Sequence, residues 1–185
     1  MSASTVISDV THTLEELLKS AQRPASSFDV SLKSPAEEIS QQKPKVNLFL
    51  YRIAENVFAR NQERQPIGLN ALEYPPLWLN AFFLLTPFAE EKLDELRVFG
   101  EAMRVLHDNS VVTGPALQGA LEHTSEELRV TLCQFTFEQL AQIWNALDKP
   151  YRLSVCYEVR TMFIDSLIQT PVSRVLEIDH SFSQS

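Results

Sequence analysis

The sequence predicts one α+β domain over residues 1–185, with a mostly antiparallel or mixed β-sheet of about four to six strands flanked by about three helices. A length of 185 residues suits a single domain, and an apolar content of 44% is enough to bury a substantial core. Segments whose apolar residues recur every three or four positions are interspersed with segments in which apolar residues alternate. The resulting order is helix, strands, helix, strand, helix, strands, which is typical of a layered fold of sheet and helices.

The first helix is predicted over about residues 4–21. Its apolar residues recur at helical spacing: Val6, Ile7, Val10, Leu14, Leu17, Leu18 and Ala21. The following segment, about residues 22–45, is polar, contains three prolines, and is expected to be a mobile arm over the surface. Within it, the alternation of Phe28, Val30 and Leu32 predicts one short strand.

Two buried strands are predicted at Val46–Ile53 and Leu77–Leu85, because apolar residues occupy both of their faces. The segment between them, Glu55–Pro76, is rich in Asn, Gln, Arg and Pro. Loops of this length are usually functional or disordered. The second strand carries three aromatic residues, Trp78, Phe82 and Phe83. Burial in the core is the favoured interpretation for them, and a hydrophobic docking site is the alternative.

A second helix is predicted within residues 84–112. Thr86 and Pro87 favour a helix start there, because a threonine oxygen can accept an unpaired N–H and proline fits the first turn. The expected apolar face consists of Leu93, Leu96, Phe99, Met103 and Leu106. The acidic residues on this helix are interpreted as a solvated face, with a protein-facing acidic patch as the alternative.

The remaining elements follow a loop predicted at Ser110–Glu127. Leu128–Phe135 is predicted to be a strand, and Thr136 with Gln139 has the spacing of a capping box that opens a third helix. That helix is expected to reach about Leu147 and to bury Leu140, Ile143, Trp144 and Leu147.

Alternation is clearest over Tyr151–Asp165, which predicts a strand with one core face and one wet face. A last strand or tail is expected over about residues 166–185.

Composition argues against several functions. The net charge of −8 disfavours binding to nucleic acid or to an anionic membrane. With four glycines the chain offers no glycine-rich phosphate loop, and the four histidines lack the paired spacing of a metal site, so no cofactor is expected. The N-terminus lacks a basic region followed by an apolar run, so we expect no signal peptide and a cytoplasmic location at synthesis.

The strongest candidates for catalysis are Cys133 and Cys156, served by His107 or His123. Both cysteines lie in predicted strands, where a buried and inert thiol is the usual case. A reducing cytoplasm argues against a disulfide between them. The sequence therefore predicts a protein that is not an enzyme.

An ordered set of motifs carries a family resemblance. The motifs are VNLFLYRIAENVFARN (46–61), LLTPFA (84–89), GEAMRVLHDN (100–109), LRVTL (128–132), EQLAQIWNAL (138–147) and PYRLSVCYEVR (150–160). This set resembles the cap, or tail-terminator, proteins of phage-tail-like extracellular contractile injection systems. The resemblance implies a phage tail-terminator-like fold and a structural role without catalytic residues.

Such caps form a hexameric ring that terminates the inner tube and sheath and stabilises the extended particle, which can be released extracellularly. The implied partners are further copies of this chain, sheath subunits, and the inner tube or a tube-terminating protein. A related second cap protein is an open possibility. The alternative is an adaptor on another component of the particle.

Interfaces are expected where polar segments surround the core and where charges can pair between subunits, because each chain carries −8. The candidate interface residues are Arg60, Arg64, Arg97, Arg104, His107, Asp108, Arg174, Leu176 and Ile178.

Overall fold

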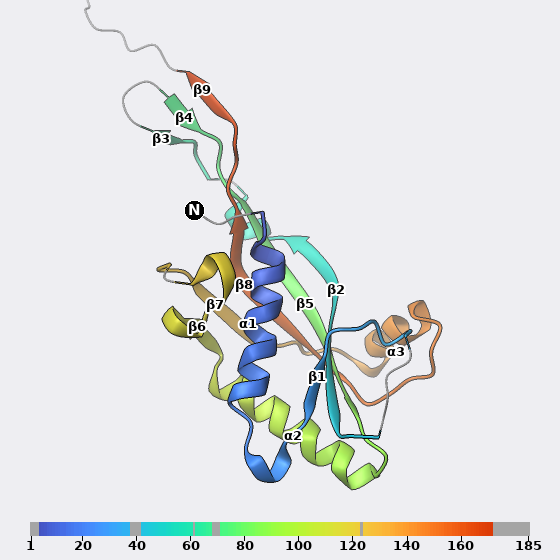
Figure 1. Ribbon diagram of the computed structural model, residues 1–185. Coiled ribbons are helices and arrows are strands. Elements are labelled where there is room, and N and C mark those ends of the chain that lie inside the picture. The colour runs from blue at the N-terminus through green and yellow to red at the C-terminus, as the bar shows by residue number, and fades with distance from the viewer. Residues whose placement is uncertain (1–3, 38–41, 61, 68–70, 123, 172–185) are drawn as a thin grey trace, which may run out of the picture.

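The centre of the computed structural model is a six-stranded sheet in the order β1–β2–β5–β8–β7–β6 (Figure 1). The structure describes residues 4–37, 42–60, 62–67, 71–122 and 124–171. The strands are β1 (Asp29–Ser31), β2 (Lys45–Glu55), β5 (Leu77–Phe88), β6 (Val111–Thr113), β7 (Glu127–Leu132) and β8 (Val155–Ile164). β1 runs parallel to β2, and the other neighbours in this sheet are antiparallel. The predicted α+β class with a mostly antiparallel or mixed sheet is confirmed.

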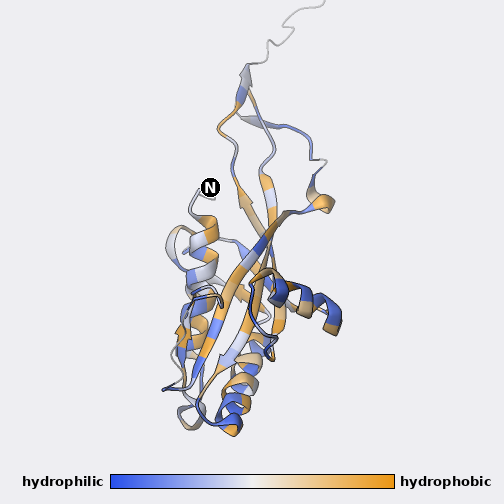
Figure 2. Ribbon diagram, turned by 90° about the vertical axis from the view of Figure 1, so that its right-hand side faces the viewer, coloured by the Kyte–Doolittle hydropathy of each residue, from blue (hydrophilic) through white to orange (hydrophobic). Residues whose placement is uncertain are grey.

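Three α-helices lie among the described residues, as predicted. α1 (Val6–Ser20) and α2 (Lys92–Asp108) pack on one side of the sheet, and α3 (Phe137–Ala146) lies on the other side (Figures 1 and 2). Within the described part of the chain, none of the helices has the length and apolar character needed to cross a bilayer.

The core lies between the sheet and the two helices α1 and α2. Its fully or almost fully buried members include Val10, Leu14, Leu18, Leu48, Phe83, Ala102, Val105, Leu128 and Val159. The bounds of α1 and the inward positions of its apolar residues agree with the helix predicted over residues 4–21. Each fully buried leucine or phenylalanine stabilises the fold by about 1.5–3 kcal/mol relative to an exposed one.

Strand alternation divides the three aromatic residues of β5. Phe83 is buried in the core, as favoured from the sequence. Trp78 and Phe82 are only partly buried and lie on the opposite face, because side chains alternate along a strand. There the Trp78 ring packs against the Phe163 ring at an interplanar angle of 44°, with 4.7 Å between the ring centroids.

The helix start predicted at Thr86 and Pro87 is wrong. Both residues belong to β5, where Pro87 pairs with Val46 of β2. Pairing of β5 with β8 ends at Leu85, so Pro87 lies where β5 has one neighbouring strand and its missing N–H is tolerated. The helix begins at Lys92 instead.

The predicted apolar face of α2 is wrong in its first half. Leu93 and Leu96 are 76% and 45% exposed, whereas the predicted Phe99 and Leu106 are buried as expected. The buried face of α2 consists of Glu95, Val98, Phe99, Glu101, Ala102, Val105 and Leu106. The acidic residues Glu95 and Glu101 are therefore buried. The spacing of apolar residues in the sequence does not predict that an acidic residue is buried.

Segments predicted to be loops contain short ordered elements. Glu55–Pro76 includes η2 (Val57–Ala59), β3 (Gln65–Ile67) and β4 (Ala71–Glu73). Ser110–Glu127 includes β6 and the turns η3 (Gly114–Ala116) and η4 (Gly119–Leu121). The polar segment at residues 22–45 contains η1 (Pro24–Ser26) and β1. The short strand predicted within this segment is therefore confirmed.

Strand ends and the third helix differ little from expectation. β7 ends at Leu132 and not at Phe135, and β8 begins at Val155 and not at Tyr151. The capping box at α3 is confirmed. The Thr136 hydroxyl accepts from the Gln139 N–H, and the Gln139 side chain accepts from the Thr136 N–H.

Candidate assembly interface

A thin projection extends from one end of the molecule. β2, β5 and β8 lead beyond the helices to a small sheet of β3, β4 and β9 (Gln169–Pro171), in the order β3–β4–β9 (Figure 1). We call the described residues between 56 and 77 and between 165 and 171 the projecting arm. Among the described residues, β3 and β9 each pair only with β4. No described strand covers the outer backbone edges of β3 and β9, and edges of this kind can pair with another chain.

The projecting arm exposes several large apolar side chains. They are Val57, Phe58, Tyr74, Leu77, Leu167 and Ile168. Phe58 and Leu167 are each 96% exposed. Clusters of exposed apolar residues on a soluble surface mark sites of interaction with other proteins. The arm is therefore the strongest candidate for an assembly contact.

Two of the predicted interface arginines, Arg60 and Arg64, lie on this arm. Arg60 Nη2 is 3.1 Å from Glu55 Oε2, and both side chains are substantially exposed. The Arg64 guanidinium lies 4.7 Å from the centroid of the Tyr74 ring. Exposed pairs of this kind contribute about 0–1 kcal/mol, so both arginines can exchange these contacts for a partner at little cost.

The other described candidates lie on α2, at the end of the molecule away from the arm (Figure 1). Arg97 Nη1 is 2.7 Å from Asp94 Oδ1 on the exposed side of the helix, and His107 is exposed as well. Together with Leu93 and Leu96 they form a second exposed surface, which we call the outer face of α2. Arg174, Leu176 and Ile178 lie outside the described residues.

Arg104 and Asp108, in contrast, take part in a network within the chain. The Arg104 guanidinium donates to the Glu101 carboxylate, to Asp108 Oδ2 and to the Ala21 carbonyl oxygen. Glu101 is buried. Hydrogen bonds from Arg104, and to a lesser extent from Arg23, lower the pKa of Glu101 to about 2. These contacts join α2 to the end of α1. A contribution of Arg104 and Asp108 to an interface stays a prediction.

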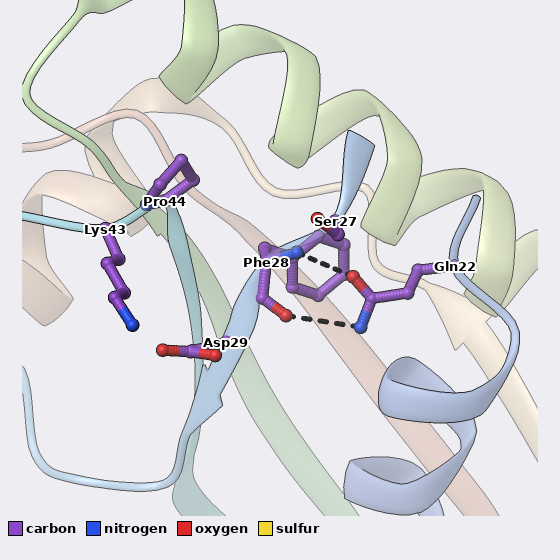
Figure 3. Close-up of a pocket in the computed structure, with 6 residues that line it drawn as sticks. All are labelled: Gln22, Ser27, Phe28, Asp29, Lys43 and Pro44. Atoms are coloured by element: carbon purple, nitrogen blue, oxygen red, sulfur yellow. Dashed lines mark hydrogen bonds between the residues drawn. The ribbon is translucent and has the colours of Figure 1, made fainter. Parts of the chain in front are cut away.

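An open cavity of about 220 Å³ lies beside β1 (Figure 3). Its lining residues are Gln22, Ser27, Phe28, Asp29, Lys43 and Pro44. The Gln22 side chain is already occupied, because its oxygen accepts from the Phe28 N–H at 2.6 Å and its nitrogen donates to the Phe28 carbonyl at 3.2 Å. Pockets for small molecules usually measure about 300–1,000 Å³. The cavity is small and polar, and it does not gather a set of catalytic groups.

Known proteins share sequence and structural features with this chain. The sequence profile described as the Pvc16 N-terminal domain matches residues 9–177. The chain belongs to the Pvc16 N-terminal domain family. No curated protein sequence matches the chain significantly.

Two solved structures share the fold of this Pvc16 N-terminal domain. One is the sheath/tube terminator of the extracellular contractile injection system PVC in its extended state, with a TM-score of 0.72 and 17% identity over 100% of this chain and 65% of that one. The other is the tube-terminating cap of the anti-feeding prophage, with a TM-score of 0.68 and 16% identity over 95% of this chain and 61% of that one. The chain thus spans less than two thirds of either protein. The resemblance to cap proteins is confirmed.

Among the described residues, the fold does not bring the candidate catalytic residues together. Cys156 is on the sheet face opposite the core, because its neighbours Tyr157 and Val159 alternate with it along β8. His107 is exposed on α2, which packs on the core face of the sheet, and His123 lies outside the described residues. The geometry therefore provides no cysteine–histidine pair among the described residues.

One group of possible metal ligands is found among the described residues, on α1 of this domain. The ligand atoms of His12, Glu15 and Glu16 lie within 4.8 Å of one another. Lys19 Nζ binds both carboxylates, at 2.8 and 2.9 Å, and is the main reason that the pKa of Glu15 is lowered. The positions on one turn of a surface helix explain this group as ordinary ion pairing.

Sequence reasoning missed the apolar residues of the projecting arm in this domain. Val57 with Phe58 and Leu167 with Ile168 are apolar pairs within segments rich in polar residues, and that contrast is the local signal that could have identified them. Their common location follows only from the fold, because β4 and β9 pair although about a hundred residues separate them.

Proposed function

We propose that this chain is a structural cap of a contractile injection system. The observation that carries the proposal is the fold, which matches a sheath/tube terminator and a tube-terminating cap over 100% and 95% of this chain. In this proposal it forms a hexameric ring that terminates the inner tube and the sheath. The ring's partners are sheath subunits and the tube or a tube-terminating protein, within a particle that is released from the cell.

The two exposed surfaces suit a subunit of a ring. A ring subunit needs at least two contact regions, one for each neighbour, and a cap also needs a contact to the layer beneath it. The projecting arm and the outer face of α2 lie at opposite ends of the molecule (Figure 1). The edges of β3 and β9, which no described strand covers, can add a strand from a neighbouring subunit, which provides backbone hydrogen bonds without a deep pocket.

Charge also favours contacts between an arginine-bearing surface of one subunit and an acidic surface of another. The side chains of Arg60 and Arg97 are 65% and 56% exposed, and each forms a weak ion pair within its own chain. The whole chain carries a net charge of −8. Acidic surfaces of a neighbour or of a sheath subunit are suitable partners for these arginines. The proposal includes no contact with nucleic acid or membrane, and no catalytic activity.

The test compares particles assembled with and without this chain, from the same tube, sheath and baseplate components. Negative-stain electron microscopy measures the distribution of tube lengths, and a gold-labelled tag locates the chain. The expected result is tubes of uniform length with the label at one end, and tubes of irregular length without the chain. Equal length distributions would overturn the proposal. A label that follows cargo rather than the particle end would favour the adaptor alternative.

A further inference from the structure

The two cysteines of the chain lie directly opposite each other across neighbouring strands. The register of β7 and β8 pairs Leu132 with Tyr157, and continuing it by one residue beyond β7 places Cys133 opposite Cys156. The Cys133 N–H donates to the Cys156 carbonyl oxygen at 2.8 Å, which fixes this pairing. Residues opposite each other in an antiparallel pair share one face of the sheet, and at a hydrogen-bonded position their Cα atoms are about 5.5 Å apart. That Cα separation lies within the range of about 4.4–6.8 Å that disulfides span.

The surroundings of the two thiols differ. Cys156 is buried, and its Sγ is 3.0 Å from the Tyr51 hydroxyl of β2, whereas Cys133 is partly exposed. A hydrogen bond with Cys133, and less strongly the contact with Tyr51, lowers the pKa of Cys156 although burial opposes this shift. The Cys133 pKa is raised, because its proton is held in the bond to Cys156. The charged groups that act on the two thiols include Glu158, Arg160 and Arg52.

We propose that Cys133 and Cys156 form an intramolecular disulfide when the folded protein meets an oxidising thiol–disulfide environment. The bond joins the residue after β7 to the second residue of β8. It therefore closes the base of the segment 134–155, which carries α3. Reducing conditions keep the thiols free, so the bond forms after the protein has left such conditions. This inference does not depend on the proposed capping function.

The reaction balances with a low-molecular-weight disulfide such as oxidised glutathione as the oxidant. The partly exposed Cys133 is the thiol that glutathione can reach. As Cys133 gives up its proton, its sulfur attacks one sulfur of the glutathione disulfide, which forms a mixed disulfide and releases the first glutathione thiolate. The Cys156 thiolate then attacks Cys133 Sγ, which forms the protein disulfide and releases the second glutathione thiolate. Two protons pass from the cysteines to the two glutathiones, and the protein loses two electrons.

The test incubates the full chain in glutathione buffers of increasing oxidised fraction and measures intact mass and thermal unfolding. We expect a monomer that is about 2 Da lighter, with a non-reducing peptide map that joins the peptides of Cys133 and Cys156. The closed loop is expected to raise Tm by roughly 5–10 °C, reversed by a reducing agent. A stable glutathione adduct, a disulfide between two chains, or two free thiols in the most oxidising buffer would overturn the proposal.

Cysteine variants provide the matched controls. Cys133→Ser and Cys156→Ser are expected to show no loss of mass and no redox-dependent change in Tm. Because Cys133 is only partly buried, the Tm of Cys133→Ser is expected to equal that of the reduced parent within about 2 °C, whereas Cys156→Ser places a hydroxyl at a buried site and is expected to lower the Tm. If either variant still shows the redox-dependent rise in Tm, the disulfide is not its cause and the proposal fails. The measurement on the parent chain stands even if a variant folds poorly.

Discussion

Glu101 on α2 binds Arg23, three residues after the end of α1, through three hydrogen bonds. Glu101 Oε1 accepts from the Arg23 backbone N–H at 2.7 Å, and Oε2 accepts from Arg23 Nε at 3.0 Å and Nη2 at 2.8 Å. Arg104 donates to the same carboxylate from the next turn of α2. One buried acid therefore connects the two helices that cover the sheet.

This connection predicts a loss of stability in acid. The folded protein holds the pKa of Glu101 at about 2, whereas its ordinary value is 4.5. Between these values the unfolded chain binds more protons, so stability is complete above about pH 5 and decreases as the pH falls toward 2. The arginines are partly exposed, which screens the interaction, and we expect a loss of at most about 2 kcal/mol. Thermal unfolding between pH 6 and pH 2.5 measures it.

Glu101→Gln is expected to remove most of this pH dependence and to destabilise the protein at pH 7 by about 1–3 kcal/mol, because two arginines lose a buried charged partner. Glu16→Gln is the matched control, because Glu16 is an exposed acid that pairs with Lys19 on α1. An equally steep acid dependence in Glu101→Gln would show that other carboxylates cause it.

A second prediction concerns the contact between α1 and η4. Gly119 has a φ of +64°, and a Cβ on it would lie within 2.4 Å of Asp9 Oδ1. Gly119→Ala is therefore expected to lower the free energy of unfolding by about 1–3 kcal/mol, through backbone strain and displacement of Asp9. Chemical denaturation measures the change.

Gly100→Ala is the control for this substitution. Gly100 lies within α2, and a Cβ there meets no atom within 4 Å. Alanine is expected to stabilise this position by about 0.5–1 kcal/mol, since glycine is a poor helix former. Destabilisation of equal size at both positions would contradict the explanation from backbone conformation.

The sequence predicts an element correctly when the residues that determine it lie close together along the chain, and less well when they lie far apart. Thr136 and Gln139 are three residues apart, and their capping box was predictable because both partners are local. Thr86 and Pro87 carry a local signal for a helix, but pairing with β2 outweighs it, and that partner is about forty residues away. The buried position of Glu101 likewise depends on Arg23, which is 78 residues distant.

The candidate interface was likewise predicted only where its residues could be identified from their local sequence. Arg60 and Arg64 could be selected from their polar loop, because exposed charge is a local property. The apolar side chains of the projecting arm come from separate segments, and only the pairing of β4 with β9 brings them together. The sequence therefore identified the fold class more completely than the candidate interface.

A third prediction tests a buried hydrogen bond beneath α3. Trp144 Nε1 donates to Ser154 Oγ at 3.0 Å, and both residues are almost fully buried. Ser154→Ala leaves the indole N–H without its partner and is expected to cost about 1–3 kcal/mol of unfolding free energy. Tryptophan fluorescence during denaturation measures it. Ser34→Ala removes an exposed hydrogen bond, from the Ala36 N–H to the Ser34 hydroxyl at 3.2 Å, and is expected to change stability by less than about 0.5 kcal/mol.

A fourth prediction separates the role of the projecting arm in assembly from its role in folding. Phe58→Ser removes an apolar ring that is 96% exposed, so the Tm is expected to stay within about 2 °C of the parent. If Phe58 packs into a partner, the same change should weaken incorporation into tube–sheath particles by roughly tenfold or more. Quantitative blotting of purified particles measures incorporation.

Val111→Ser on β6 is the matched control for Phe58→Ser, because Val111 is an exposed apolar residue outside the projecting arm. Equal incorporation of the Phe58 variant and the parent would exclude this side chain from the contact, whereas equal losses in both variants would indicate a general surface effect.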